Sequence, residues 1–567
     1  MPDITFRINR QKVTAPEGAN LLEIIQTNQI ELPDLCQTDD RGQTIHTCLV
    51  ELDREKEVKP AHQIKVKTDL RVSTNSGWAR QQRQEAYLLI EQYHQRKCDQ
   101  CQTGQTCELM VEVKKLQEKD LADARTGQQY SLHRMTQAAE LDATACIGCN
   151  KCVEACQKVG IDYLHLEGEG RFKHIQPSQD PQVDCIYCGQ CTVSCPVKAA
   201  REQSQLQQVE QVLADQDLIT IVQMAPSVRA SIGEEFGAQV GLNLEKKMFT
   251  AFRQLGFDYV FDVNMGADIT TLVEAEELVD RLQQGGTLPM FTSCCPAWVK
   301  FVEFYYPEMI PHLTDSRSPQ IHAGAAYKTW WAQKVGLDPK KMRVVSIMPC
   351  TSKKYEARHQ KLMVDEMWPV DYVLTTRETA SLLKKNKIEL LELSDGELDE
   401  YGQYTGAAAI YGASGGVMES ALRTAAHLIE GRDLPKLEFE QVRGMEGIKK
   451  AELELGGQTL RVAVVQMAGN MHQLIKEIKD DPEAYHYVEF MACPGGCIGG
   501  GGQPIPADDE KTAKRIEGLY QIDNQMHLRQ AHQNQIAREF VEYANSQPEE
   551  KKQALLYTHY QAKQKGE

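Results

Sequence analysis

The run CIGCNKCVEAC at residues 146–156 and its second copy, CIYCGQCTVSCP at residues 185–196, together contain eight closely spaced cysteines. Each copy has the spacing C-x2-C-x2-C-x3-C. In such runs three thiolates wrap one [4Fe-4S] cluster, while the fourth crosses to the other cluster. The pair predicts two clusters, one on Cys146, Cys149, Cys152 and Cys195, the other on Cys156, Cys185, Cys188 and Cys191. Two structural zinc sites are the alternative, because CxxC pairs also suit zinc, but the duplicated pattern favours clusters.

The composition is that of an ordinary globular protein with an acidic balance. The chain has 567 residues, 41% of them hydrophobic, and a formal net charge of −17. This length predicts several domains, and the charge argues against binding nucleic acid or an anionic membrane surface. The first residues, MPDITFRINRQKV, lack the apolar core of a signal peptide, and no run is long enough to span a membrane. We therefore expect a cytoplasmic protein.

The hydrophobic pattern divides the chain into five segments. Residues 1–75 alternate apolar and polar positions in short runs, which predicts a small strand-rich domain. Residues 76–125 combine helical periodicity with a cysteine group, and residues 126–205 hold the duplicated run. Residues 206–517 alternate strand-like apolar runs with amphipathic helical stretches, which is typical of an α/β domain. Residues 518–567 are polar and helical, so we expect a peripheral appendage there.

A further cysteine group precedes the duplicated run. It reads His94-x3-Cys98-x2-Cys101-x5-Cys107. Three thiolates and one imidazole could hold either zinc or a [4Fe-4S] cluster, and the spacing does not decide between them. A histidine near cysteines is also more often an ordinary surface residue than a ligand.

Five cysteines lie in three short runs of the large domain. The runs are TSCCPAW at 292–298, MPCTSKKYE at 348–356 and MACPGGC at 491–497. Four thiolates that converge from three strand-end loops could anchor one more cubane, and α/β folds build their active sites at such loops. One cysteine would then be left over for chemistry.

These three runs resemble the signature motifs of [FeFe]-hydrogenases, and the resemblance extends over essentially the whole chain. It implies small ferredoxin-like iron–sulfur domains (α+β) followed by a large two-lobed α/β domain that holds the H-cluster. In this reading the cubane of the H-cluster is held by Cys295, Cys350, Cys493 and Cys497. Cys497 also bridges to a diiron unit with carbon monoxide, cyanide and azadithiolate ligands. The implied activity is the reversible interconversion of dihydrogen with protons and electrons.

The resemblance also assigns roles around the diiron unit. Cys294 is implied to pass protons to it, a role that suits a small thiol with a tunable pKa. Lys353 is implied to donate a charge-assisted hydrogen bond to a cyanide ligand. The remaining pocket residues are implied to be Ser227, Gln320, Met348 and Met491.

A proton path is predicted partly by spacing. Glu274, Glu277 and Arg281 stand at i, i+3 and i+7, on one face of a helix. Spacing alone favours a solvated stripe with a Glu277–Arg281 ion pair. The resemblance instead implies that protons move from Cys294 through water to Glu274, then to the Thr314 hydroxyl and to Glu277. The family often has serine at the hydroxyl position.

The resemblance further implies a [4Fe-4S] cluster on the His94 group, which gives three such clusters beside the H-cluster. At the amino terminus the family places a [2Fe-2S] cluster on four cysteines that include a CxxC. Cys36 and Cys48 stand there, but the CxxC partner position is Ile45, and residues 58–66 contain no cysteine. We expect this ferredoxin-like (β-grasp) domain to keep its fold and to hold no [2Fe-2S] cluster.

Two alternatives to a catalytic hydrogenase are a non-catalytic iron–sulfur assembly factor and a sensory hydrogenase. An assembly factor has no need of Cys294, Lys353, Glu274 and Glu277 together. Sensory relatives tend to lack the relay cysteine and to carry an added signalling domain. For a catalytic hydrogenase the expected partners are diiron maturation proteins and, as electron donor, ferredoxin or a dedicated iron–sulfur subunit. Such subunits occur in complexes that couple hydrogen oxidation to a formate dehydrogenase.

Overall fold

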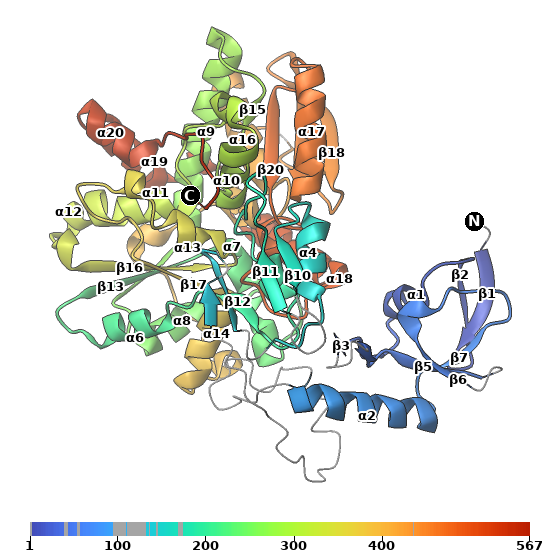
Figure 1. The fold of residues 1–567 in the computed structure, drawn as a ribbon. Coiled ribbons are helices and arrows are strands. Elements are labelled where there is room, and N and C mark those ends of the chain that lie inside the picture. The colour runs from blue at the N-terminus through green and yellow to red at the C-terminus, as the bar shows by residue number, and fades with distance from the viewer. Residues whose placement is uncertain are drawn as a thin grey trace.

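The structure is a computed structural model, shown in Figure 1. It describes residues 3–38, 44–53, 57–93, 109, 132–134, 136–142, 146–167, 174–434 and 436–566. The predicted ligands His94, Cys98, Cys101 and Cys107 lie outside the described residues. None of the helices described is both long and apolar enough to cross a membrane.

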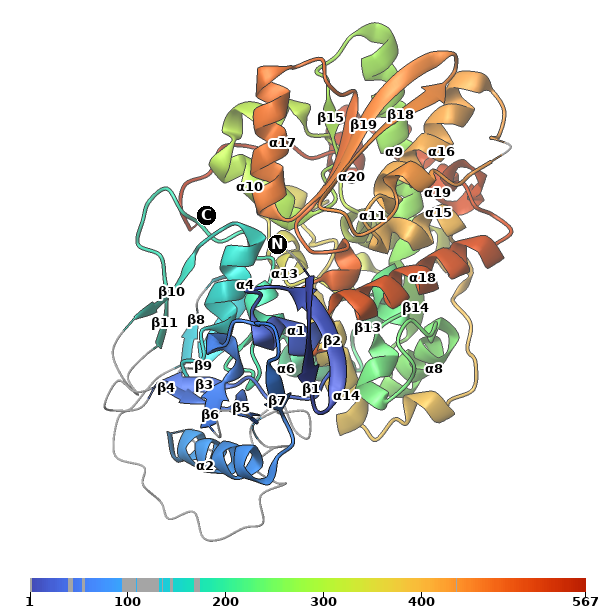
Figure 2. The ribbon, with the colours of Figure 1, turned by 90° about the vertical axis from the view of Figure 1, so that its right-hand side faces the viewer.

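The N-terminal domain is a five-stranded sheet crossed by one helix. Its strand order is β2-β1-β7-β5-β6. Period-two alternation builds this sheet: Phe6 and Ile8 of β1 point into the core, while Arg7 between them is exposed. The bounds are β1 (Asp3–Ile8), β2 (Gln11–Pro16), α1 (Leu21–Thr27), β5 (Leu49–Leu52), β6 (Glu57–Pro60) and β7 (Arg71–Ser73). A separate ribbon pairs β3 (Cys36–Thr38) with β4 (Thr44–His46), and α2 (Gly77–Tyr93) follows the sheet. Figure 1 shows this domain at one end of the molecule, and in Figure 2 the same domain faces the viewer.

The duplicated cysteine runs fold in the same way. In each, a residue in the left-handed conformation, Asn150 (φ 69°) or Gly189 (φ 72°), precedes a short helix that carries the third cysteine. These helices are α4 (Lys151–Val159) and α5 (Gln190–Val193). Around them lie a three-stranded sheet and a hairpin, with the strands β8 (Leu132–Arg134), β9 (Ala139–Asp142), β10 (Leu164–Glu167), β11 (His174–Pro177) and β12 (Ala200–Glu202).

The large domain has two lobes, each built on a four-stranded sheet. The first sheet, in the order β14-β13-β16-β17, is parallel throughout. The second, in the order β15-β20-β19-β18, is parallel except for the β18–β19 pair. The strands are β13 (Ile219–Met224), β14 (Tyr259–Asp262), β15 (Met290–Phe291), β16 (Met342–Met348), β17 (Tyr372–Thr375), β18 (Ile448–Leu455), β19 (Gln458–Gln466) and β20 (Tyr487–Met491).

One long helix joins the two lobes. This helix, α9 (Val263–Gln284), packs against α11 (Pro319–Ala326) and α16 (Gly416–Glu430) (Figure 1). The other helices that follow the sheets include α8 (Glu245–Leu255), α10 (Pro296–Tyr305), α14 (Thr376–Lys385) and α17 (Ala468–Asp480). Small iron–sulfur domains followed by a two-lobed α/β domain are the fold class that the sequence predicts, and this prediction is confirmed.

The C-terminal segment is integrated into the large domain. It forms α18 (Asp509–Gln525), α19 (Gln535–Asn545) and α20 (Glu549–Leu556). Leu519, Phe540 and Leu555 on these helices are fully buried. The segment is therefore not the peripheral appendage expected from its polar composition, because α18 and α19 each turn a narrow stripe into the core and α20 ends in the buried pair Leu555 and Leu556. The expected boundary at residue 518 falls inside α18.

After α20 the chain runs back to the domain that holds the duplicated cysteine runs. Lys563 forms an ion pair with buried Glu303 at 2.7 Å. The Lys565 ammonium donates to the carbonyl oxygens of Ser178 and Asp180, both at 2.6 Å. The backbone N–H of Gly566 donates to the Asp184 carboxylate at 3.0 Å. Residues 563–566 therefore fasten that domain to the large domain.

Candidate active site and iron–sulfur centres

A cavity lies where the strands β13 and β16 end, at the carboxyl edge of the first sheet. The loops after these strands begin with Ala225 and Pro349, and α7 (Pro226–Arg229) starts at the cavity wall. Active sites of open α/β sheets form at this edge. The functional side chains at the cavity are Ser227, Cys294, Gln320, Met348, Cys350, Lys353, Tyr411 and Cys497.

Four cysteines from three loops converge beside this cavity. Cys295 follows β15, Cys350 follows β16, and both Cys493 and Cys497 follow β20. Burial, and then the charges of the neighbouring thiolates, raise the pKa of Cys493 and Cys497, and the pKa of Cys350 is raised to about 11. Four buried thiolates this close together repel one another unless a cation neutralises them. The donor set fits a [4Fe-4S] cluster, whose iron supplies that charge.

The polar groups of the cavity fit the diiron unit that the resemblance implies. Ser227 Oγ and Gln320 Oε1 are buried without a hydrogen-bond partner in the described part of the chain. The Lys353 ammonium donates to the Cys294 carbonyl and to Glu356, both at 2.9 Å, which leaves one of its three donors for another acceptor. These groups can bind the polar ends of cyanide and carbon monoxide ligands.

The two methionines differ in position. Met348 lines the cavity. Met491, at the end of β20, is 1% exposed but is not one of the lining residues, so it contributes to the core behind the cavity. Gly412 lies close to the cavity residue Ser227. A Cβ at position 412 would lie 2.5 Å from Ser227 Oγ, so a side chain there would not fit.

The proposed proton donor Cys294 lies next to a buried carboxyl group. Burial raises the pKa of Cys294 well above its usual value, and the charge of Glu274 raises it further. Burial likewise raises the pKa of Glu274 to about 8, although a hydrogen bond from Tyr487 lowers it. The Tyr487 hydroxyl donates to Glu274 Oε1 at 2.5 Å, while Oε2 has no partner among the described residues. Both groups are thus mainly protonated near neutral pH, and Oε2 remains available for proton exchange.

The residues predicted for the outer part of the path are in contact with one another. Thr314 Oγ1 donates to Glu277 Oε2 at 2.5 Å, and Arg281 donates to Glu277 Oε1 at 2.5 Å. The Glu277–Arg281 ion pair that spacing favours is present, but the two side chains are only 18% and 14% exposed, so the stripe is not solvated. Burial raises the pKa of Glu277. In the described structure no hydrogen bond joins Glu274 to Thr314, and Glu274 accepts from Tyr487 instead.

The sequence analysis did not identify Tyr487. Its residue type carries no signal for a proton path, and it lies 213 positions from Glu274. The contact arises only because β20 packs beside α16, which in turn packs against α9.

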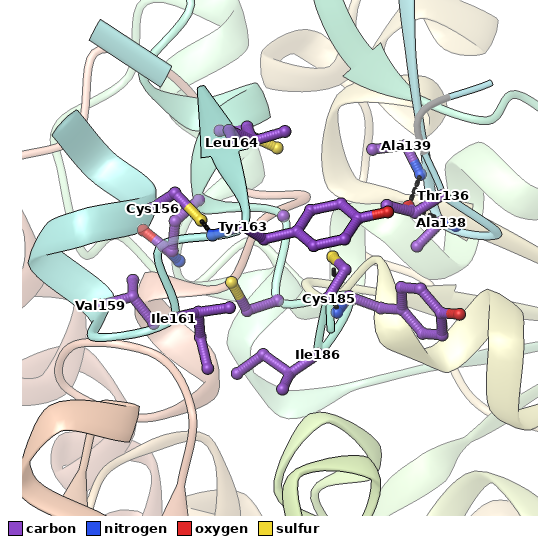
Figure 3. A pocket seen from close by; sticks show the side chains of 15 residues that line it. Thr136, Ala138, Ala139, Cys156, Val159, Ile161, Tyr163, Leu164, Cys185 and Ile186 are labelled. Carbon is purple, nitrogen blue, oxygen red and sulfur yellow. Dashed lines mark hydrogen bonds between the residues drawn. The ribbon is translucent and has the colours of Figure 1, made fainter. Parts of the chain in front are cut away.

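The eight cysteines of the duplicated runs form two groups of four. Cys156 of the first run lines one cavity together with Cys185, Cys188 and Cys191 of the second run (Figure 3). In the other group, burial raises the pKa of Cys149, Cys152 and Cys195. The charge of Cys195 raises the pKa of Cys149 and Cys152 further, and the charge of Cys146 raises that of Cys195. The backbone therefore brings together the two sets that the crossed pattern predicts. The ligand sets themselves stay predictions.

The group of Cys156, Cys185, Cys188 and Cys191 lies against the cysteines of the large domain. Cys493 Sγ donates to the Cys188 carbonyl at 3.9 Å. Burial raises the pKa of Cys188, and the charges of Cys350 and Cys295 raise it further. A Cβ on Gly189 would meet Thr351 Oγ1 at 2.3 Å, so only glycine allows this approach. Close packing of this kind suits electron transfer between two clusters.

The N-terminal domain does not fit a [2Fe-2S] cluster held by four cysteines. Ile45 lies in β4 with 9% of its surface exposed and offers no donor. Cys48 is fully buried, and its Sγ lies 3.0 Å from Nδ1 of His62. His62 belongs to residues 58–66, which contain no cysteine that could serve as a further ligand.

Family models match four parts of the chain. Residues 218–501 match the iron only hydrogenase large subunit, C-terminal domain, and residues 509–563 match the iron hydrogenase small subunit. Residues 145–199 match a 4Fe-4S dicluster domain, and residues 2–77 match a 2Fe-2S iron-sulfur cluster binding domain.

Individual relatives agree with these matches. The NADP-reducing hydrogenase subunit HndD of Solidesulfovibrio fructosivorans is 36% identical over 587 residues and covers 100% of both chains. Iron hydrogenase 1 of Clostridium pasteurianum is 36% identical over 573 residues, which cover 98% of this chain and 99% of that one. The solved structure of an apo variant of [FeFe]-hydrogenase HydA1 from Chlamydomonas reinhardtii is 38% identical, with a TM-score of 0.57, and covers 64% of this chain and 99% of its own. The chain belongs to the iron-only, or [FeFe], hydrogenases and is an iron–sulfur oxidoreductase of that family.

Proposed function

We propose that the chain is a catalytic hydrogenase that interconverts dihydrogen with protons and electrons. Its H-cluster would be held by Cys295, Cys350, Cys493 and Cys497. When bound, the diiron unit supplies the metal site at which the H–H bond forms or breaks. The observation that carries the proposal is the buried pair of Cys294 and Glu274 beside the cavity, because only a site that moves protons needs it.

The chain's own residues would hold and move the proton. Cys294 keeps its proton at neutral pH because burial raises its pKa. Glu274, with a pKa of about 8, lies close enough to the working pH to accept and release a proton. Tyr487 fixes the carboxyl group by binding Oε1 and leaves Oε2 for exchange. Thr314 and Glu277, held by Arg281, form the outer end of the path.

The two alternative functions account less well for these residues. An iron–sulfur assembly factor would need the cubane ligands but neither Cys294 nor the buried Glu274. A sensory hydrogenase needs no fast proton path, whereas this chain has both the thiol and the Thr314–Glu277 hydrogen bond. The thiol, the buried carboxyl group and the Thr314–Glu277 hydrogen bond therefore support catalysis over these alternatives.

Electrons would pass through the two clusters of the duplicated runs and the cluster on His94, Cys98, Cys101 and Cys107. We infer that residues 1–75 hold no [2Fe-2S] cluster, on the basis of the donors around Cys48. Electrons would then enter from ferredoxin or from a dedicated iron–sulfur subunit in the cytoplasm. A formate dehydrogenase complex is one setting for such a subunit, and the relative HndD is itself named as a subunit of an NADP-reducing hydrogenase.

The test is dihydrogen evolution from reduced methyl viologen. The full chain is produced anaerobically together with the diiron maturation proteins. We expect strong evolution that disappears in Cys294→Ala, while the iron content and the infrared bands of the carbon monoxide and cyanide ligands stay unchanged. No evolution from a chain that shows those bands would refute the proposal.

A further inference from the structure

Two histidines and an aspartate from separate segments meet where the C-terminal segment packs on the second lobe. His427 lies in the last turn of α16, and Gly431, in the left-handed conformation (φ 68°), ends that helix. The chain then turns back and brings Asp433 beside His427. His532 comes from η14 (Ala531–Gln533), a short 3-10 helix that packs against α16.

The three side chains converge on one carboxylate oxygen. Asp433 Oδ1 lies 2.9 Å from His427 Nδ1 and 2.8 Å from His532 Nε2. The three donor atoms all lie within 4.8 Å of one another. The two imidazole rings face each other, with 3.9 Å between their centroids and an angle of 15° between their planes. Two nitrogen donors and one oxygen donor are thus gathered in one place.

Hydrogen bonds alone leave the charge of this group unbalanced. Burial lowers the pKa of His532, and the charge of His427 lowers it further against the opposing effect of Asp433, because two protonated rings stacked this closely repel each other. Neutral imidazoles leave the Asp433 carboxylate without a positive partner, since no lysine or arginine pairs with it in the part of the chain that the structure describes. A cation held between the three side chains would supply that charge.

A neighbouring glutamine holds the carboxylate in the orientation that a metal ligand needs. Gln533 Nε2 donates to Asp433 Oδ2 at 3.1 Å, which leaves Oδ1 facing the imidazoles. The Gln533 side chain is itself fixed, because its Oε1 accepts from the backbone N–H groups of Arg529 and Gln530 at 3.1 and 3.3 Å. Ligating carboxylates in protein metal sites are commonly held by such hydrogen bonds.

We propose that His427, Asp433 and His532 bind one zinc ion, with water as the fourth ligand. Imidazole nitrogens and a carboxylate oxygen are ligands of zinc, whereas Mg²⁺ and Ca²⁺ are bound by oxygen ligands. Three protein ligands leave one position of the ion open. Because the Asp433 side chain is 46% exposed, water reaches that position and the ion can exchange. Zinc binding here depends neither on dihydrogen evolution nor on the ligands of the iron–sulfur clusters.

Small movements convert the hydrogen-bonded group into the metal site. With zinc about 2.0–2.1 Å from each donor, tetrahedral ligand atoms are roughly 3.3 Å apart, compared with the observed 2.8 and 2.9 Å between the Asp433 oxygen and the two nitrogens. The stacked rings also tilt, so that both nitrogens point at the ion. His427 and Asp433 are partly exposed and free to adjust, while His532, with a side chain only 10% exposed, keeps its place on η14.

Zinc at this place would fasten the C-terminal segment to the second lobe. The buried pair of Arg423 and Asp523 already joins α16 to α18 at 2.9 Å. His427 stands four residues after Arg423 and therefore on the same face of α16. The zinc ion would add a second, exchangeable link beside the permanent ion pair, and the C-terminal segment would be held more firmly when zinc is bound.

The test measures zinc binding to the full chain, purified anaerobically with its clusters, treated with EDTA and dialysed against Zn²⁺. The variants are Asp433→Asn and His532→Gln, with His527→Gln, an exposed histidine of the same segment, as the matched control. Asp433→Asn is the decisive variant because this side chain is exposed and nearly unchanged in shape, so the fold is kept. Zinc and iron per chain are measured by elemental analysis, and the zinc ligands by X-ray absorption at the zinc edge.

We expect the wild type and His527→Gln to bind about one zinc ion more per chain than the two site variants, with equal iron in all four proteins. The absorption spectrum of this zinc should show imidazole and oxygen ligands without sulfur, and a large excess of Mg²⁺ should not displace it. Zinc should raise the thermal unfolding midpoint only of the proteins that bind it. Equal zinc in all four proteins, or zinc bound through sulfur, would overturn the proposal and leave hydrogen bonds as the link among the three residues.

Discussion

Replacing Tyr487 with phenylalanine tests whether Glu274 carries protons. The substitution removes the hydroxyl that donates to Glu274 Oε1 at 2.5 Å and keeps the ring that fills the space. A hydrogen bond to a charged group contributes about 1.5–3 kcal/mol. At about 1.36 kcal/mol per pKa unit, its loss raises the pKa of Glu274 by roughly 1–2 units.

The sign of the effect follows from the state that the hydrogen bond stabilises. The hydroxyl stabilises the carboxylate and so holds the pKa of Glu274 near 8, below the value that burial alone would give. In Tyr487→Phe the carboxyl group stays protonated to a higher pH. The ionised fraction at pH 7, about a tenth in the wild type, falls by roughly ten- to a hundredfold. If the ionised form accepts the proton, activity at pH 7 falls and recovers as the pH rises.

The assay is dihydrogen evolution from reduced methyl viologen as a function of pH. In Tyr487→Phe, we expect the part of the rate–pH profile that follows the ionisation of Glu274 to shift to higher pH by roughly 1–2 units. Tyr520→Phe is the matched control, because that hydroxyl is buried without a partner among the described residues. A profile that stays in place, or moves to lower pH, would show that Glu274 does not carry the proton in the way proposed.

Three further predictions concern the path, the core and the junction between domains. Thr314→Val should lower the rate of dihydrogen evolution on the order of tenfold or more, because it removes the hydroxyl, and Thr314→Ser should restore the rate. If Thr314→Val is as fast as the wild type, Thr314 is not part of the path. Arg229→Met should lower the urea concentration at which half of the large domain is unfolded. The substitution leaves Asp262, which pairs with Arg229 at 2.6 Å, buried without its partner, and this lowers the free energy of unfolding by about 3–5 kcal/mol. An unchanged midpoint would contradict this prediction. Gly189→Ala should reduce the iron content, because the new Cβ would meet Thr351; full iron content would show that the junction can adjust.

The cysteine groups could be predicted from sequence because cluster ligation is a local property. A run such as residues 146–156 places three thiolates around one centre by its spacing, and left-handed residues such as Asn150 and Gly189 set the turn. The fold class follows from equally local signals, the alternation of strand-like and helical runs. The structure brings the cysteines of the two duplicated runs together as those signals predict.

Contacts between distant segments could not be predicted in this way. The spacing of Glu274, Glu277 and Arg281 places them on one helical face, but it does not say that α9 lies between two lobes and is buried along most of its length. Tyr487 becomes the partner of Glu274 only through sheet order. The polar composition of α18 to α20 gave no indication that residues such as Phe540 are buried. A few apolar residues on one side of a helix change the average hydrophobicity of the segment very little.

The contacts of residues 563–566 have a consequence for the timing of assembly. These residues leave the ribosome after every group that they bind, including Glu303 and Asp184. The domain with the duplicated cysteine runs therefore gains these last contacts only after its eight cysteines, and the large domain, have been synthesised. Until then the nascent chain lacks this fastening, so the order of synthesis sets the order in which the two domains are joined.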